Sequence, residues 1–317
     1  MRLDVHAHYF SPGYLDLLER SGMRKDITEP GRRTMMSNRS ADFAERFDAM
    51  QKAGIAKQIL SCSGVAPYHL EERKAVECAR FINDEYAALA AEFPDRFAAF
   101  TVLPQPHVAA SLSELARGLD ELHTVGVTMV TSILGHGLAD PLWDPIYEEL
   151  NRREAVLFIH PAGLACDSPT LVQTGLTWPL GAPFEDTVCA LELMQAGFLT
   201  RFPKIKTILP HLGGTLPFLM QRLDHMAGRF MPGKGVPHEL ARKFWYDTVN
   251  GYVPSLKLAI DAFGIDRLLF GTDWPFWKGE AHQLAADYLA QAGLSAADIA
   301  KIDTANAQAI FGSRYPL

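Results

Sequence analysis

Short β-rich runs alternate with amphipathic helical segments along almost the whole chain, and this alternation constrains the fold more than any other feature. Eight runs are predicted to be strands: Leu3–His8, Lys57–Cys62, Phe97–Leu103, Gly126–Ser132, Val156–His160, Lys206–His211, Phe244–Val249 and Arg267–Thr272. Eight strand–helix units in series are typical of a parallel (β/α)8 barrel. The chain has no internal repeat and no low-complexity linker, so we expect residues 1–317 to form a single domain.

Composition and charge exclude several classes of protein. The chain has 30 basic and 37 acidic residues, a formal net charge of −7, which argues against a general nucleic-acid-binding surface. No apolar run is as long as a membrane span, so no membrane partner is expected. The four cysteines are widely spaced without a CxxC pair, and no leader segment precedes the first strand. A reduced, cytoplasmic location is therefore expected.

Two long connections follow the carboxyl ends of predicted strands. Ser21–Ser40, after the first strand, is rich in arginine, and Pro161–Glu185, after the fifth, is rich in proline, glycine and apolar residues. A third, Ala227–Arg242, lies beyond the helix that follows the sixth strand. Because active sites of such barrels lie at the carboxyl ends of the strands, the first two predict a lid or a substrate wall, with plain solvated loops as the alternative.

Four histidines and one aspartate stand at the carboxyl ends of four predicted strands. His6 and His8 end the first strand, His160 ends the fifth, His211 ends the sixth, and Asp273 follows the eighth. A barrel would bring these ends to one rim, and imidazole with carboxylate suits Zn²⁺, with Mn²⁺ and other first-row ions as alternatives. We therefore predict one metal ion held by His6, His8, His160 and Asp273. His211 would either ligate it or act as a general base beside it.

Four motifs, in this order, carry a family resemblance: HAH from residue 6, FIHP from 158, LPHLGGTLPF from 209 and FGTDWP from 270. They resemble motifs of the amidohydrolase superfamily, and within it the aminocarboxymuconate-semialdehyde decarboxylase branch, which includes γ-resorcylate and 6-methylsalicylate decarboxylases. The resemblance runs from His6 to about Phe311 and implies a distorted TIM barrel, a single metal ion and a catalytic role for His211. The fourth predicted strand lacks the lysine that bridges two metals in many relatives, which favours a mononuclear site.

The resemblance also implies how a substrate carboxylate is bound. In this branch an arginine one helix beyond the catalytic histidine reaches the site of the neighbouring subunit, and Arg222 matches it, which implies a homodimer. A second arginine is expected from the segment after the first strand, where Arg33 is chosen over Arg32 and Arg39. A guanidinium group offers a rigid fork for a carboxylate. The alternatives are a surface ion pair for Arg222 and a solvated run of charge for the segment.

Aromatic residues flank the predicted site and suit a flat conjugated substrate, although buried aromatics of a barrel rim are equally ordinary. They are Trp178, Phe184, Trp274 and Phe276. Trp178, with Arg222 and Arg33, is taken as a substrate-binding residue.

These features predict a metal-dependent carboxy-lyase, a non-oxidative decarboxylase of a hydroxybenzoate or an aminocarboxymuconate-semialdehyde type of acid. In one mechanism His211 activates water, hydroxide adds to the conjugated system, and CO2 then leaves. In the other the substrate oxygens bind the metal, Asp273 protonates a ring carbon, and CO2 leaves. The alternative function is a metal-dependent hydrolase or hydratase of a lactone, ester or amide, and a third is an inert, metal-stabilised binding module.

Overall fold

The structure is a computed structural model that describes residues 1–34 and 39–317, and it is built around one parallel sheet of eight strands. In sheet order the strands are β1 (Arg2–His8), β2 (Ile55–Ser61), β3 (Phe97–Val102), β4 (Gly126–Val130), β7 (Val156–His160), β8 (Lys206–Leu209), β9 (Trp245–Asp247) and β10 (Leu268–Leu269). All eight predicted strands are confirmed, in chain order. The last three end earlier than predicted, so His211 begins a short 3-10 helix after β8 instead of ending the strand. Asp273 follows the last strand, as predicted.

The sheet closes on itself through contacts between β1 and the segment after β10. The Val5 amide donates to the Phe270 carbonyl at 2.9 Å, and the Asp273 amide donates to the His6 carbonyl at 2.8 Å. A parallel bridge also joins Ala7 to Trp274. The result is the predicted (β/α)8 barrel, in which the first and last strands fix Asp273 beside His6.

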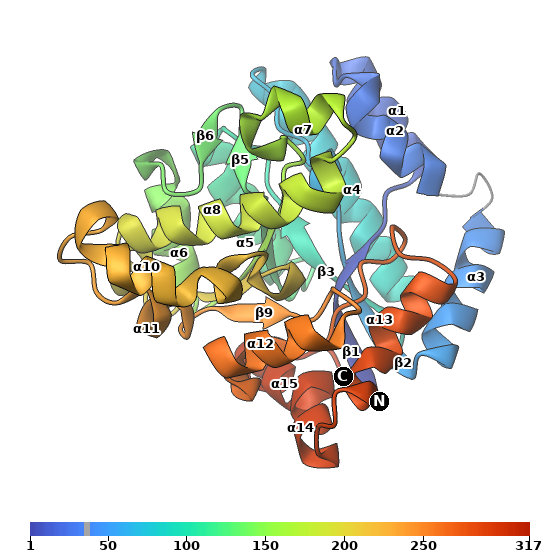
Figure 1. Ribbon diagram of the computed structural model, residues 1–317. Coiled ribbons are helices and arrows are strands. Elements are labelled where there is room, and N and C mark those ends of the chain that lie inside the picture. The colour runs from blue at the N-terminus through green and yellow to red at the C-terminus, as the bar shows by residue number, and fades with distance from the viewer. Residues whose placement is uncertain (35–38) are drawn as a thin grey trace.

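Helices surround the strands, as Figure 1 shows. They are α1 (Pro12–Ser21), α2 (Lys25–Thr34), α3 (Arg39–Lys52), α4 (Glu72–Glu92), α5 (Val108–Asp120), α6 (Asp144–Arg152), α7 (Pro169–Gln173), α8 (Ala182–Gln195), α9 (Phe198–Arg201), α10 (Leu216–Phe230), α11 (Pro237–Ala241), α12 (Val253–Phe263), α13 (Glu280–Gln291), α14 (Ala296–Ala300) and α15 (Asn306–Phe311). A two-stranded antiparallel hairpin, β5 (Ser132–Ile133) and β6 (His136–Gly137), follows β4. No helix among the described residues combines the length and apolar character needed to cross a membrane.

A register shift in β1 decides which way the first two histidines face. Leu3 and Val5 pack in the buried cluster inside the barrel, together with Phe158 of β7. Strict alternation would send His6 to the opposite face, but the pairing with β2 shifts between Asp4 and Ala7. As a consequence the His6 ring lies 5.1 Å from the Phe158 ring, at the top of the same inner cluster.

The connections predicted as long loops contain helices. The predicted Ser21–Ser40 loop contains α2 and the start of α3, and its residues 35–38 lie outside the described part; α1 precedes it. Ser11 caps α1 by accepting from the Tyr14 amide, and Pro12 occupies its first turn, where proline is tolerated. The connection after β7 contains α7, and the Ala227–Arg242 segment holds the end of α10 and α11.

Candidate metal centre and pocket

Four predicted ligand residues meet at the carboxyl ends of β1, β7 and β10. The Nε2 atoms of His6 and His8 are 3.0 Å apart, and the His8 Nε2 lies 3.0 Å from the Asp273 Oδ1. The His6 Nε2 lies 3.4 Å from the same oxygen. With His160, one ligand atom from each of the four buried residues lies within 4.8 Å of the others. This group can hold one metal ion.

The outer nitrogens of the three imidazoles are hydrogen-bonded to the surrounding protein. The His6 Nδ1 donates to the Asp247 Oδ2 at 2.6 Å, and the His160 Nδ1 donates to its neighbouring carbonyl, that of Pro161, at 2.9 Å. The His8 Nδ1 shares a 2.9 Å hydrogen bond with the Ser61 hydroxyl. Partners of this kind fix the ring orientation and the tautomer of a ligating histidine, leaving Nε2 for a cation. The donor set therefore fits a metal ion.

Charge in the cluster also favours a cation. Burial lowers the pKa of His8 to about 4 and that of His160 well below its usual value, so both rings are neutral. Burial raises the pKa of Asp273, but its hydrogen bonds to His6 and His8 outweigh this and hold the pKa well below its usual value. Burial likewise lowers the pKa of His6, while Asp247 outweighs burial and raises it to about 10. His8 and His160 are therefore neutral donors beside the ionised Asp273. A divalent ion would take the place of the proton that Asp247 and Asp273 hold on His6.

His211 stands next to this cluster with a carboxylate behind it. Its Nδ1 donates to the Asp186 Oδ2 at 2.9 Å, which leaves Nε2 as the ring nitrogen available to a substrate. Its amide donates to the Asp247 Oδ1, so Asp247 connects His211 with His6. Burial acts to lower the pKa of His211, but the charge and hydrogen bond of Asp186 outweigh burial, so the pKa is raised. A residue placed in this way can transfer a proton.

Asp186→Asn is expected to move the pH dependence of catalysis to lower pH. The carboxylate stabilises the imidazolium form of His211, so its loss lowers the pKa of that ring. The limb of the kcat/KM profile that belongs to His211 should shift with it, whether the ring acts as acid or base. Asp224→Asn is the matched control. Asp224 also pairs with the Nδ1 of a histidine, that of His238 at 2.6 Å, but this pair lies outside the site. A profile with unchanged limbs and a lower plateau would contradict this role for Asp186.

Two of the functional positions hold a strained backbone. His211 has a φ of 52° and Asp273 a φ of 61°, both in the left-handed region that side chains other than glycine rarely adopt. Strain of this kind persists where the surrounding structure enforces it, and it is concentrated at functional sites. At Asp273 the hydrogen bond from its amide to His6 is one such constraint.

An aromatic-walled pocket of about 420 Å³ opens over the cluster, a volume within the usual range for small-molecule sites. Beyond His160, His211 and Asp273 it is lined by Pro30, Trp178, Pro179, Ala182, Pro183, Val249, Asn250, Phe276 and Trp277. The Trp178 and Phe276 rings stack with centroids 6.4 Å apart and an interplanar angle of 18°. No lysine or arginine lines it within the described residues. The pocket suits a flat, largely apolar molecule that reaches the metal ligands.

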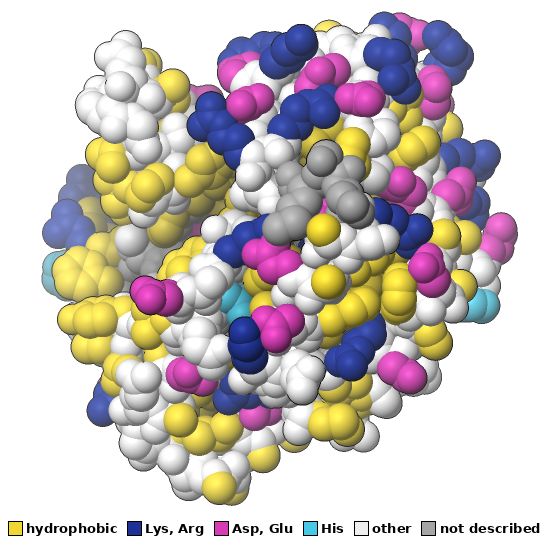
Figure 2. Space-filling model, turned by 90° about the vertical axis from the view of Figure 1, so that its right-hand side faces the viewer, with side chains coloured by type: hydrophobic (Ala, Val, Ile, Leu, Met, Phe, Trp, Pro, Cys, Tyr) yellow, Lys and Arg dark blue, Asp and Glu magenta, His cyan; other side chains and the backbone are white. Residues whose placement is uncertain are grey.

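The predicted substrate-binding residues have different locations. Trp178 lines the pocket, whereas Arg222 is exposed on α10 and Arg33 is exposed on α2, where its Nε pairs with Glu29 at 3.0 Å. On the face that carries α1, α2 and α3, basic and acidic side chains are interspersed (Figure 2), so the arginine-rich segment is balanced by carboxylates. Phe184 and Trp274 are not among the lining residues, and Trp274 is buried.

Sequence reasoning missed the residues that support the site from behind. Asp247 ends β9, but the predicted strand ran on to Val249, so the sequence placed Asp247 inside a strand and gave it no role. Ser61 likewise ends β2. Asp186 and Glu185 lie on α8, where no motif marks them and only the packing of this helix against the barrel brings them to the site.

Glu185 organises the loop that follows His160. Its Oε2 accepts from the Thr131 hydroxyl and from the amides of Ala162 and Gly163, and its Oε1 accepts from the Ala165 amide. This carboxylate is only 6% exposed. It therefore fixes the start of the segment that carries Trp178 to the end of β4.

Glu185→Gln is expected to destabilise the protein by about 2 kcal/mol, because a hydrogen bond to a charged group is worth about 1.5–3 kcal/mol and the new amide nitrogen cannot accept one. The measurement is urea unfolding of the variant beside the wild-type protein. Glu192→Gln, about two turns further along α8, is the control, since Glu192 accepts no hydrogen bond from this loop's amides. Equal unfolding free energies for all three proteins would show that the Glu185 hydrogen bonds do not stabilise the fold.

Comparisons with known proteins agree with this geometry. The chain is 32% identical over 287 residues to the γ-resorcylate decarboxylase of Rhizobium sp., covering 84% of this chain and 86% of that protein. It is 27% identical over 299 residues to the 2-amino-3-carboxymuconate-6-semialdehyde decarboxylase of Dictyostelium discoideum, covering 88% of this chain and 83% of that protein. The fold matches a crystal structure of a dihydroxybenzoic acid decarboxylase from Polaromonas sp. JS666, which holds manganese and the inhibitor 2-nitroresorcinol. The TM-score is 0.82 and the sequence identity 28%, and the match covers 98% of this chain and 96% of that chain. The amidohydrolase family model Amidohydro_2 matches residues 3–313, and the chain therefore belongs to this amidohydrolase family.

Proposed function

We propose that this protein is a metal-dependent carboxy-lyase that removes CO2 from an aromatic or conjugated carboxylic acid. The observation that carries the proposal is the aromatic-walled pocket that opens directly onto four candidate metal ligands and His211. The relatives support the substrate class, because they include decarboxylases of γ-resorcylate, 6-methylsalicylic acid and 2-amino-3-carboxymuconate-6-semialdehyde. The substrate is accordingly a hydroxybenzoate or a conjugated semialdehyde acid.

Each group of residues has a separate task in this reaction. His6, His8, His160 and Asp273 would hold the ion, which when bound acts as a Lewis acid toward negative charge on the substrate oxygens. Trp178 and Phe276 hold the ring of the substrate and exclude water. In one route His211, through Nε2, takes a proton from water as hydroxide adds to the conjugated system. It then gives that proton to the carbon that bears the carboxylate, and CO2 and the added hydroxide leave. In the other route the ionised Asp273 first takes a proton from a substrate hydroxyl and passes it to that ring carbon, and CO2 leaves. In both cases a C–H bond replaces the bond to CO2.

We propose Zn²⁺ as the ion, with Mn²⁺ as the alternative. Three imidazoles and one carboxylate are a suitable ligand set for zinc, while the structure from Polaromonas holds manganese. A cytoplasmic location is part of the same proposal, supported by free cysteines at positions 62, 78, 166 and 189. We also treat residues 1–317 as one domain, since the family model spans 3–313.

The test uses substrate panels in deuterium oxide. γ-Resorcylate, 6-methylsalicylate and the semialdehyde acid would be incubated with metal-loaded protein, and the products examined by mass spectrometry and NMR. A decarboxylase leaves one solvent deuteron on the carbon that lost CO2, whereas a hydrolase or hydratase retains every carbon–carbon bond. Lactones and esters form the parallel panel. Turnover confined to that second panel would replace the lyase by the hydrolase.

We further propose that the active protein is a homodimer in which Arg222 binds the substrate carboxylate at the neighbouring site. No lysine or arginine of the described residues lines the pocket, so a carboxylate there has no ammonium or guanidinium partner from its own chain. Arg222 is exposed on α10, and Phe218 on the same helix is 79% exposed, as an interface residue would be in the free chain.

Mixing two inactive variants tests this arrangement. In a mixed dimer of Arg222→Ala and His211→Ala, one site receives both intact residues. Unfolded together and refolded, the variants should recover about a quarter of wild-type activity, because half of randomly formed dimers are mixed and each of these has one intact site. No recovery, with dimers present by light scattering, would place Arg222 outside the neighbouring site.

A further inference from the structure

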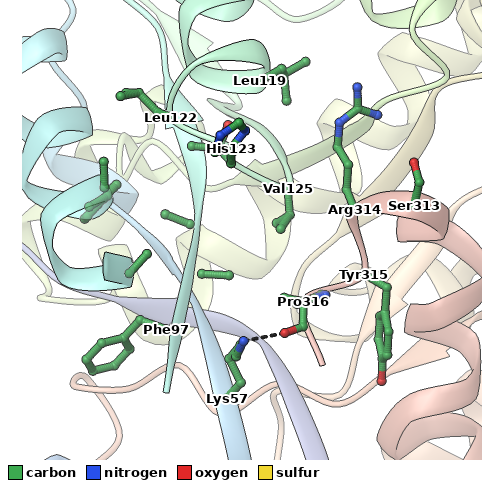
Figure 3. Close-up of a pocket in the computed structure, with 16 residues that line it drawn as sticks. Lys57, Phe97, Leu119, Leu122, His123, Val125, Ser313, Arg314, Tyr315 and Pro316 are labelled. Atoms are coloured by element: carbon green, nitrogen blue, oxygen red, sulfur yellow. Dashed lines mark hydrogen bonds between the residues drawn. The ribbon is translucent and has the colours of Figure 1, made fainter. Parts of the chain in front are cut away.

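A second cavity lies at the end of the barrel opposite the metal centre. It is formed at the amino ends of β2, β3 and β4, between α4 and α5, and the C-terminal residues 313–316 close one side. Its volume is about 370 Å³, close to that of the pocket over the metal ligands and large enough for a small organic molecule. Figure 3 shows Lys57 and Pro316 at one end of this cavity, and Leu119, Leu122 and His123 at the other.

Lys57 of β2 is the distinctive group in this cavity. The residue is only 9% exposed, and its Nζ donates to the main-chain oxygen of Pro316 (Figure 3). An ammonium group has three donors, and within the described residues no carboxylate lies within ion-pair distance of this one. Burial lowers the pKa of Lys57, with the more distant charge of Asp95 acting in the opposite direction. The cavity thus contains a buried ammonium group whose one hydrogen-bond acceptor among the described residues is a neutral carbonyl.

The remaining walls combine basic side chains with apolar surface. His123 and Arg314 also line the cavity, and no aspartate or glutamate of the described chain does, although the chain as a whole carries a net charge of −7. The apolar part of the lining includes Ala87 and Ala90 of α4 and Leu122 beyond α5. A cavity with a buried cation, further basic side chains and an apolar wall is complementary to an anion with a hydrophobic body.

We propose that this cavity binds a small organic carboxylate, whose charged group pairs with Lys57 and whose apolar body packs against α4 and α5. The site is separate from the metal centre, since its lining shares no residue with the pocket that contains His211. It does not depend on the reaction proposed above.

Calorimetric titration of the metal-free protein with benzoate and with hexanoate tests this site. Lys57→Met removes the cation, and Ala90→Leu fills the apolar side while leaving Lys57 in place. The control is Lys206→Met, because Lys206 begins β8 at the same end of the barrel and does not line the cavity. Circular dichroism would confirm that each variant is folded.

Wild type and Lys206→Met should bind at least one of the two acids with equal affinity. Each cavity variant should weaken that binding by about tenfold or more, which is the expected loss of one charge-assisted hydrogen bond or of the space for the ligand. Failure of wild type to bind either acid would overturn the proposal. Unchanged binding in Ala90→Leu would also overturn the proposal. This second variant keeps the test decisive if Lys57→Met does not fold.

Discussion

Replacing His211 with alanine is expected to lower kcat by about 10²- to 10⁴-fold, the usual contribution of a general acid–base group, while the metal content stays the same. His211 contacts Asp186 through Nδ1 and faces the pocket, whereas the four candidate ligands meet one another without it. The alanine variant therefore loses the proton-transfer group and retains the donor set. Steady-state kinetics on the acid that proves active, together with elemental analysis of the same sample, measures both effects.

The control for this variant is His225→Ala, which removes an exposed histidine on α10. Its kcat and metal content should equal those of the wild type. If His211→Ala loses the metal together with its activity, His211 is a ligand, and the four-residue set is incomplete.

Asp273→Asn is expected to lower the affinity for the metal by more than about 100-fold, because changes to residues that only support a ligand already cost 10- to 100-fold. Asp273 supplies the one negative charge of the four-residue cluster. Asparagine tolerates the left-handed backbone of this position, where φ is 61°, so the change removes charge without adding strain. Titration against a chelator of known affinity gives the metal affinity.

Activity should fall with metal occupancy in this variant and return in part at high metal concentration. Asp261→Asn, at an exposed position on α12, is the matched control and should bind the metal as the wild type does. Wild-type affinity in Asp273→Asn would remove Asp273 from the ligand set.

The strands were predictable because each is a short apolar run bounded by turn residues, and barrel closure then follows from their number and parallel order. Helices α1 and α2 were not, because Pro12, Gly13, Pro30 and Gly31 suggest breaks. In α1 the proline lies in the first turn and Ser11 supplies the cap, so the helix forms despite these residues. Local composition alone does not distinguish such a helix from a loop.

Residues at the carboxyl ends of strands could be assigned to one site from the sequence, since a barrel brings those ends together. His6, His8, His160 and Asp273 do lie together, and their role as metal ligands stays a prediction. Asp186 could not be assigned, because its reach to His211 depends on how α8 packs. Arg33 was chosen from a segment without a unique alignment, and its exposed position on α2 depends on a helix that the sequence did not reveal.

Release of CO2 by the metal-loaded protein, measured beside a chelated sample, tests metal-dependent decarboxylation most directly. The acids would be γ-resorcylate, 6-methylsalicylate and 2-amino-3-carboxymuconate-6-semialdehyde, with the metal content of each sample determined beforehand. The predicted result is CO2 in equal amount to the carboxyl-free product from at least one acid, abolished by chelation and restored by adding the ion. Equal CO2 release from the chelated sample, or none from any of these acids at full metal loading, would contradict the account.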